Sequence, residues 1–168
     1  DVIYSYEDDT LQNCIGKLLK QHGKTISTAE SCTGGLVASM ITSVAGSSEY
    51  YLGSVVSYAN SVKQEVLGVP AGIIQEFGAV SSECVGAMAE GIRKLTGTDF
   101  SVATSGIAGP GGGSTEKPVG LVWIGVSSQS GTQTYKLTFN SDRKRNIERF
   151  ASSALYKIFK KLENELND

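Results

Sequence analysis

Short β-prone segments alternate with amphipathic helical segments along the 168-residue chain, and this alternation restricts the fold more than any other feature. It favours a sheet whose strands are joined by helices that cover both faces. We predict strands over residues 24–28, 52–59, 100–105, 119–126 and 132–139, and helices over residues 7–22, 36–44, 62–67, 70–77, 81–96 and 141–162. Residues 81–83 are predicted to cap the helix that runs to residue 96. The apolar spacing of the last helix predicts an inward face made of Ile147, Phe150, Ala154, Leu155, Ile158 and Phe159. The predicted fold class is α/β: a three-layer α/β/α sandwich with a mostly parallel, mixed sheet of about five strands. The short polar link at residues 127–131 predicts an antiparallel hairpin between the last two strands.

Composition argues against several classes of function. A net charge of −2 is unlike that of nucleic-acid-binding domains, which carry a basic face. No apolar stretch is long enough to span a bilayer, and no secretory signal is visible in the printed residues. The three cysteines, Cys14, Cys32 and Cys84, are odd in number and lack metal-site spacing. We therefore expect a cytoplasmic protein that binds neither nucleic acid nor membranes.

The chain contains one histidine, His22, at the end of the first predicted helix. A cation at a helix C-terminus is an ordinary structural feature, and we assign His22 that role. A Ser-His-Asp triad needs a histidine as its base. Any catalytic base in this protein is therefore expected to be another type of residue.

Residues 29–35, Ala-Glu-Ser-Cys-Thr-Gly-Gly, lie where the first predicted strand gives way to a helix. A nucleophile at such a junction faces free backbone N–H groups, which can stabilise an oxyanion. Ser31 is the candidate nucleophile, with the amides of residues 33–35 as oxyanion donors. Cys32 is a rival nucleophile, although a small buried hydrophobic residue is the simpler interpretation of it. The run also suits a helix N-cap followed by two glycines that allow close packing.

Three further segments fall at strand ends or helix starts, where ligand sites of α/β sheets form. Residues 58–63 contain Tyr58 and Lys63, which suit either a catalytic pair, since a lysine with a lowered pKa can replace histidine as general base, or a surface lysine beside a tyrosine at a strand end. The glycine-rich residues 104–114 suit either a cradle for an anion or a plain flexible loop. Residues 142–145, Asp-Arg-Lys-Arg, suit either a phosphate site or a solvated charged face.

Taken together, the motifs resemble the C-terminal domain of the competence/damage-inducible CinA family, to which the nicotinamide mononucleotide deamidases belong. The resemblance covers about residues 7–165. It rests on T-A-E-S-C-T-G-G (28–35), A-G-S-S (45–48), S-Y-A-N-S-V-K (57–63), L-G-V (67–69), G-A-V-S (78–81), S-G-I-A-G-P-G-G-G (105–113), K-P-V-G (117–120) and S-D-R (141–143). Residues 1–6 resemble a linker remnant from a longer parent chain, and the resemblance implies that residues 7–168 form the amidohydrolase domain.

The resemblance implies an amidohydrolase of pyridine nucleotide salvage that converts nicotinamide mononucleotide into nicotinate mononucleotide and ammonia, with neither metal nor cofactor. Ser31 matches the nucleophile, and Lys63 with Tyr58 matches the activating pair, Tyr58 bridging the other two. The resemblance also implies a homodimer and an N-terminal domain in the parent chain. The expected substrate-binding residues are Glu30, Thr33, Gly34, Gly35, Asn60, Ser105, Gly106, Ala108, Gly109, Gly111, Arg143 and Arg145.

Two alternatives belong to other functional classes. Short-chain dehydrogenases also use Ser, Tyr and Lys, but they need Tyr and Lys four residues apart on one helical face. Here the spacing is five residues, and the dinucleotide-binding fingerprint is missing. The other alternative is a catalytically weak nucleotide-binding or regulatory domain of a competence-related CinA protein.

Overall fold

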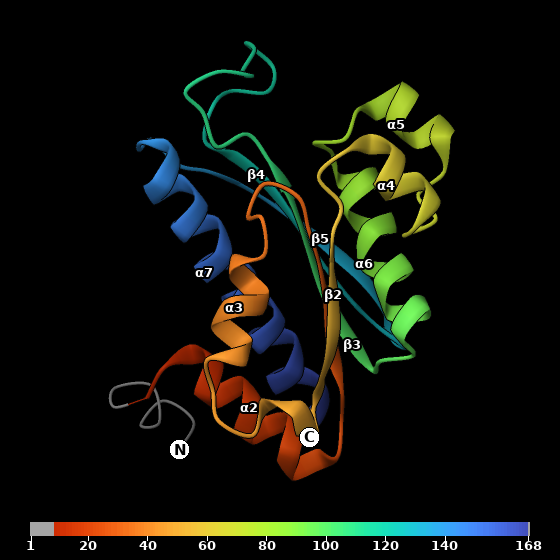
Figure 1. Cartoon of the computed structure of the whole chain (residues 1–168), viewed down its shortest axis with the longest axis vertical. Coiled ribbons are helices and arrows are strands. Elements are labelled where there is room, and N and C mark those ends of the chain that lie inside the picture. The colour runs from red at the N-terminus through yellow and green to blue at the C-terminus, as the bar shows by residue number, and fades with distance from the viewer. Residues whose placement is uncertain (1–8, 168) are drawn as a thin grey trace.

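The computed structural model describes residues 9–167, so the predicted helix start at residue 7 and the predicted linker at residues 1–6 lie outside the described residues. Helices and strands alternate as predicted (Figure 1). The elements are α2 (Leu11–His22), β1 (Ile26–Glu30), α3 (Leu36–Thr42), the 3₁₀ turn η1 (Ser47–Glu49), β2 (Tyr51–Val56), α4 (Asn60–Glu65), α5 (Ala71–Phe77), α6 (Ser82–Thr96), β3 (Phe100–Gly106), β4 (Leu121–Ser128), β5 (Gly131–Thr138) and α7 (Arg143–Leu166).

The five described strands form one mixed sheet in the order β2-β1-β3-β4-β5. β1 pairs in parallel with β2 and β3, whereas β4 is antiparallel to both of its neighbours, β3 and β5. The prediction of a mostly parallel sheet is therefore wrong in this detail, since only two of the four pairings are parallel. The reason is the connection from β3 to β4, which contains no helix, and a parallel neighbour needs a long crossover. The β4–β5 hairpin is confirmed.

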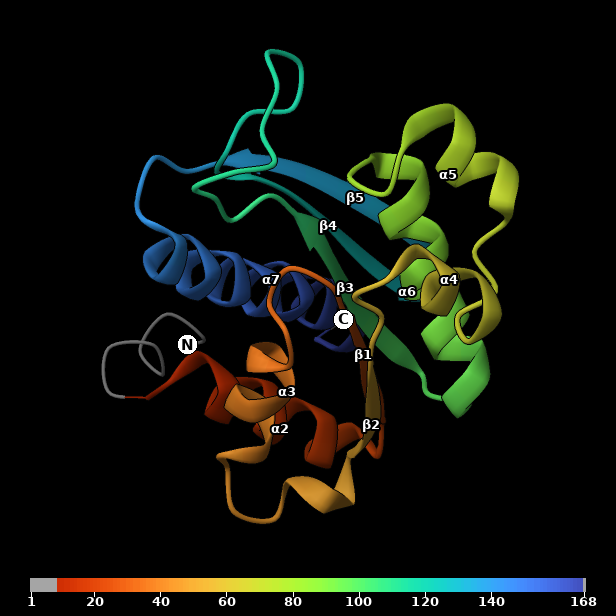
Figure 2. The same cartoon turned by 45° about the horizontal axis from the view of Figure 1, so that its top comes forward.

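Helices cover both faces of the sheet, which confirms the three-layer architecture (Figure 2). On one face α7 packs on β3 and β4 and is flanked by α2 and α3. On the other face α6 packs across β1, β3 and β4, and α5 packs on α6. None of the described helices is long and apolar enough to cross a membrane.

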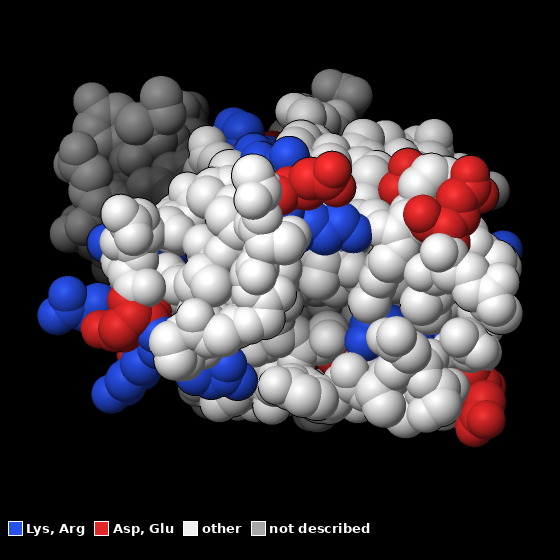
Figure 3. Space-filling model, turned by 90° about the horizontal axis from the view of Figure 1, so that it is seen from above, with Lys and Arg blue, Asp and Glu red and all other residues white. Residues whose placement is uncertain are grey.

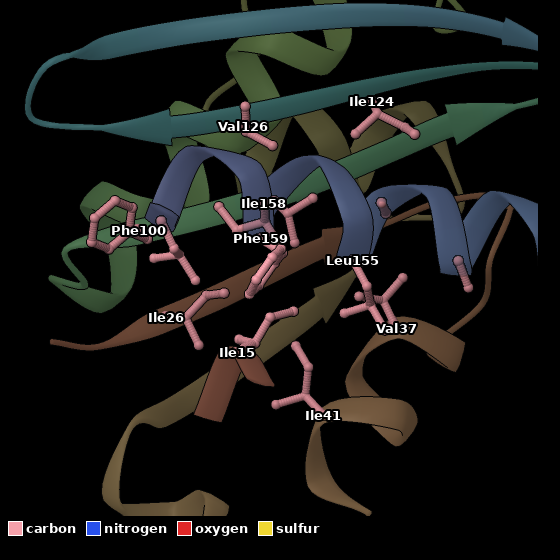
Figure 4. Packing of buried hydrophobic residues seen from close by; sticks show 14 of the residues in the cluster. Ile15, Ile26, Val37, Ile41, Phe100, Ile124, Val126, Leu155, Ile158 and Phe159 are labelled. Atoms are coloured by element: carbon pink, nitrogen blue, oxygen red, sulfur yellow. The ribbon is translucent and has the colours of Figure 1, made fainter. Parts of the chain in front are cut away.

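The larger part of the core lies between α7, α2 and the sheet (Figure 4). The predicted inward face of α7 is confirmed, because Phe150, Leu155 and Phe159 are buried there. Ile26 of β1 and Ile15 of α2 meet this face. Burying one such side chain contributes about 1.5–3 kcal/mol, so this layer holds β1 and α7 in fixed relative positions.

Most element boundaries agree with the sequence patterns to within a few residues. Ser81 caps α6 as predicted, because its hydroxyl accepts the Cys84 N–H at 3.1 Å. The exception that affects the site is β2, which ends at Val56 rather than at the predicted residue 59. The chain then turns into α4, so Tyr58 lies in a connection and not in a strand.

The order of the strands creates a switch point at the carboxyl end of β1. The chain leaves β1 through α3 on one face to reach β2, and it returns through α6 on the other face to reach β3. In open α/β sheets, ligand sites form where the connections diverge in this way. The predicted site residues lie at these strand ends: Ser31 follows β1, Tyr58 follows β2, and Ser105 is near the end of β3.

Candidate active site

One pocket of about 270 Å³ lies at this switch point, at the carboxyl ends of β1, β2 and β3. Figure 3 looks onto this end of the molecule, where the surface is hollowed and basic atoms are visible within the hollow. The residues that line the pocket come from five segments: Ser31, Cys32, Tyr58, Asn60, Lys63, Ala79, Val80, Ser105, Gly106, Ile107, Ala108, Gly109, Gly111, Gly112 and Arg143. This set contains two basic residues, Lys63 and Arg143, and no carboxylate.

Ser31 is held at the start of a tight turn between β1 and α3. Its N–H donates to the Thr104 carbonyl at 3.1 Å, which continues the pairing of β1 with β3 by one residue. Its carbonyl accepts the Gly34 N–H at 3.1 Å. Gly34 and Gly35 have φ angles of 58° and 105°, which other residues rarely adopt. The two glycines therefore make the turn that presents Ser31 to the pocket.

Lys63 lies on α4 with its ammonium group directed at Ser31. The side chain is 1% exposed, and Nζ lies 3.2 Å from Ser31 Oγ. Nζ also donates to the carbonyls of Ser57 at 2.6 Å and Tyr58 at 3.2 Å. No carboxylate of the described chain forms an ion pair with it. Burial lowers the pKa of Lys63, because desolvation disfavours the charged form.

This set of contacts suits a neutral lysine that acts as a base. Carbonyl oxygens only accept hydrogen bonds, so two N–H groups of Lys63 are directed at Ser57 and Tyr58. A neutral amine retains one lone pair, and Ser31 Oγ occupies the third position around the nitrogen. The arrangement can therefore accept the hydroxyl proton of Ser31 directly.

Cys32 is buried next to Ser31, and desolvation raises the pKa of its thiol to about 12. A thiol with such a pKa stays protonated at neutral pH, whereas the reactive form of cysteine is the thiolate. Of the two candidate nucleophiles, the geometry favours Ser31.

Tyr58 does not bridge Ser31 and Lys63, which corrects the predicted arrangement. The two partners touch directly, and Tyr58 contacts Lys63 through its backbone carbonyl. Its side chain is 64% exposed, and its hydroxyl lies 3.4 Å from an Arg143 guanidinium nitrogen. The early end of β2 turns the chain at Ser57, so the ring lies at the mouth of the pocket.

The opposite wall is formed by the glycine-rich loop after β3 and by the first turn of α7. Arg143 donates to the Gly109 carbonyl at 2.8 Å, and Asn146 donates to the Ala108 carbonyl at 3.0 Å. Asn146 was not predicted as part of the site. It could have been recognised in the sequence, because it is a polar residue four positions before Phe150 and therefore on the inward, otherwise apolar face of α7. Ala79 and Val80 were also missed, although they belong to the quoted G-A-V-S motif.

Five of the predicted substrate-binding residues lie outside the pocket lining: Glu30, Thr33, Gly34, Gly35 and Arg145. Glu30 is fully buried behind Ser31, and Thr33 donates to its carboxylate at 2.6 Å. The Gly34 amide is bonded to the Ser31 carbonyl, so it is not available as an oxyanion donor. Arg145 is exposed two residues after Arg143 on α7, and its Nε lies 3.8 Å from Asp142 Oδ2. The other predicted residues line the pocket.

Comparison with known proteins connects this pocket to a family. The model of the CinA C-terminal domain matches residues 8–162. The chain belongs to the CinA family. A CinA-like protein of Cytophaga hutchinsonii is 47% identical over 161 residues, covering 96% of this chain and 38% of that protein. This CinA domain thus spans little more than a third of the length of the curated relatives it matches.

Solved structures carry the same fold. The competence damage-inducible protein A of Klebsiella pneumoniae has a TM-score of 0.89 at 34% identity, covering 92% of this chain and 96% of that one. The competence/damage inducible protein CihA of Agrobacterium tumefaciens has a TM-score of 0.88 at 37% identity, covering 94% of both chains. The arrangement of this CinA domain, with its mixed sheet, is therefore that of the family.

Proposed function

We propose that this CinA domain is an amidohydrolase that converts nicotinamide mononucleotide into nicotinate mononucleotide and ammonia, with Ser31 as nucleophile and Lys63 as general base. The observation that carries the proposal is the 3.2 Å contact between Lys63 Nζ and Ser31 Oγ, made by a buried lysine without a carboxylate partner. A serine needs an adjacent base to attack an amide, and the protein has only one histidine, His22, on α2.

The reaction proceeds in two acyl-transfer steps. Neutral Lys63 takes the hydroxyl proton as Ser31 Oγ attacks the carboxamide carbon, and it returns the proton to the leaving nitrogen as the C–N bond breaks. Ammonia departs and an ester to Ser31 remains. Lys63 then takes a proton from water as the water oxygen attacks the ester, and it returns that proton to Ser31 Oγ as the ester C–O bond breaks and the carboxylic acid leaves. The positive charge of the substrate's pyridinium ring further favours neutral Lys63.

The charge of the pocket supports a mononucleotide substrate. Arg143 and the loop around Gly109 lie across the pocket from Ser31, in a lining that contains no acidic side chain. A guanidinium group binds phosphate through planar paired donors. With the carboxamide at Ser31, the ribose phosphate extends towards Arg143. The exposed ring of Tyr58 lies at the mouth, where it can cover the bound nucleotide.

Mass spectrometry tests the proposal, because conversion of the amide into the acid raises the substrate mass by one dalton. The wild-type protein should form nicotinate mononucleotide with stoichiometric ammonia, and Ser31→Ala and Lys63→Met should not. Ser61→Ala is the matched control, since Ser61 is exposed on α4 and outside the pocket. Near wild-type ammonia release by Ser31→Ala would refute the assignment. Binding of the mononucleotide without turnover would favour the alternative function, that of a catalytically weak nucleotide-binding or regulatory domain.

A further inference from the structure

The side chain of Glu30 is fully buried directly behind Ser31 and accepts three hydrogen bonds. Its Oε1 accepts the Thr33 hydroxyl at 2.6 Å and the Val37 N–H at 2.8 Å, and its Oε2 accepts the Ala38 N–H at 3.0 Å. No lysine or arginine of the described chain forms a salt bridge with it. A buried carboxylate is costly unless it is fully hydrogen-bonded, so these three donors define where this group can lie.

The hydroxyl protons around Glu30 have one consistent arrangement. Thr33 has a single hydroxyl proton, and it is directed at Glu30. The 2.8 Å contact between the Thr33 and Thr104 hydroxyls therefore requires Thr104 to be the donor. The backbone carbonyl of Thr104 in turn accepts the Ser31 N–H at 3.1 Å. Glu30 is thus connected to Ser31 in two ways: directly through the peptide bond between them, and through the chain of hydrogen bonds that runs from Glu30 through Thr33 and Thr104 to the Ser31 N–H.

The main chain of Glu30 also reaches the lysine. Its carbonyl accepts the Ser57 N–H at 2.8 Å, and the Ser57 carbonyl accepts Lys63 Nζ at 2.6 Å. Glu30 therefore contacts both parts of the proposed site: the turn that carries Ser31, and Ser57, whose carbonyl orients Lys63.

We propose that Glu30 is a positioning residue that sets the distance between Ser31 Oγ and Lys63 Nζ. It fixes the turn at residues 31–35 through Thr33 and the first turn of α3, and it does not touch the substrate. The inference rests on the proposed roles of Ser31 and Lys63. Proton transfer and nucleophilic attack depend steeply on the distance between the reacting groups, and an error of about 1 Å can cost about a hundredfold in rate.

Glu30→Gln tests the role with little change in volume. One carboxylate oxygen becomes an amide NH₂, which cannot accept, so it faces an N–H or O–H donor. We expect kcat to fall about ten- to a hundredfold while KM stays within about twofold, because the pocket lining is unchanged. Thr33→Val should lower kcat in the same way, and Thr33→Ser, which restores the hydroxyl, should recover most of that loss. The recovery distinguishes positioning from a general loss of packing.

The matched control is Ser27→Ala. Ser27 lies on the same strand at its other end and makes a buried 2.7 Å hydrogen bond to Thr98. This variant should lose stability comparably and keep its kcat. Thermal unfolding of all variants identifies any that fail to fold, and the Thr33 pair keeps the test decisive if Glu30→Gln is one of them.

A second readout is independent of the nucleotide. A fluorophosphonate reacts with an activated serine by forming an O–P bond and expelling fluoride, while the base takes the hydroxyl proton. Labelling of Ser31, located by peptide mass spectrometry, should slow in Glu30→Gln and Thr33→Val but not in Ser27→Ala. Labelling and turnover that are equal to wild type in folded Glu30→Gln would overturn the positioning role alone. Labelled wild-type protein that leaves the nucleotide unchanged would overturn the proposed substrate alone, and absence of labelling at Ser31 would overturn both proposals.

Discussion

Replacement of Lys63 by methionine should change how the stability of the protein depends on pH. Burial lowers the pKa of Lys63 in the folded state, whereas the unfolded chain has the ordinary lysine value of about 10.4. Between these two values the unfolded chain binds a proton that the folded protein does not bind. The free energy of unfolding of the wild type therefore rises with pH across this window. Methionine does not titrate, so Lys63→Met lacks this rise.

The size of the effect follows from the separation of the two pKa values. Each unit of separation adds about 1.4 kcal/mol to the difference in stability between wild type and Lys63→Met as the pH crosses the window. The two proteins share all other titrating groups, so the difference isolates Lys63. The Ser31→Ala protein serves as control, because it is inactive by our proposal yet keeps Lys63 in its buried position.

Urea unfolding of the three proteins between about pH 6 and pH 11 measures this difference directly. We expect the stability of wild type and of Ser31→Ala to rise relative to Lys63→Met towards high pH. A difference that stays flat, or that falls with pH, would refute the lowered pKa of Lys63. The same titration should appear in kcat/KM, which should rise with pH as Lys63 loses its proton.

The remaining predictions concern single side chains. Cys32→Ser should keep substantial activity, and iodoacetamide should modify Cys32 only slowly, because burial raises the pKa of its thiol to about 12; rapid inactivation would favour Cys32 as nucleophile. Arg143→Ala should raise KM for the mononucleotide at least tenfold, since charge-assisted hydrogen bonds contribute about 1.5–3 kcal/mol; the exposed Arg145→Ala should leave KM within about twofold, and the reverse result would reassign the phosphate site. Phe159→Ala should destabilise the protein by about 3–5 kcal/mol in urea unfolding, since the ring is buried on the inner face of α7. A loss below about 1 kcal/mol would contradict the packing described.

The helices and strands could be predicted from the sequence, because their hydrophobic periodicity is strong. The inward face of α7 and the cap of α6 at Ser81 follow from spacing and capping chemistry alone. The direction of β4 did not follow, because a strand looks the same in parallel and antiparallel pairing. The informative observation was the absence of a helical pattern between residues 107 and 120, which excludes a parallel crossover.

The candidate site was predictable at the level of segments but not of side-chain direction. Ser31, Tyr58 and the loop after Ser105 were predicted near one another because they fall at the carboxyl ends of strands, and the family resemblance added Arg143 to them. The role of Tyr58 depended on where β2 ends, and sequence boundaries are uncertain by a few residues. Glu30 belongs to a strand that is buried on both faces, so no alternation distinguishes its direction. Its three partners lie within eight residues of it, yet only the turn at Gly34 and Gly35 brings them to its carboxylate.

By our proposal, this chain activates a serine without a catalytic histidine because the fold supplies two separate environments at one strand end. On the solvent side, the pocket exposes Ser31 to a ligand and holds Arg143 for an anion. On the inner side, burial disfavours the charged form of Lys63 and two carbonyl acceptors orient its nitrogen, while the carboxylate of Glu30 accepts two N–H groups at the start of α3. The carboxylate and the amine are both buried yet do not pair with each other, and each is bonded to groups of the main chain. Had they formed an ion pair, the pKa of the lysine would have risen and the base would have been lost. Keeping the two groups apart is therefore the condition on which the proposed chemistry depends.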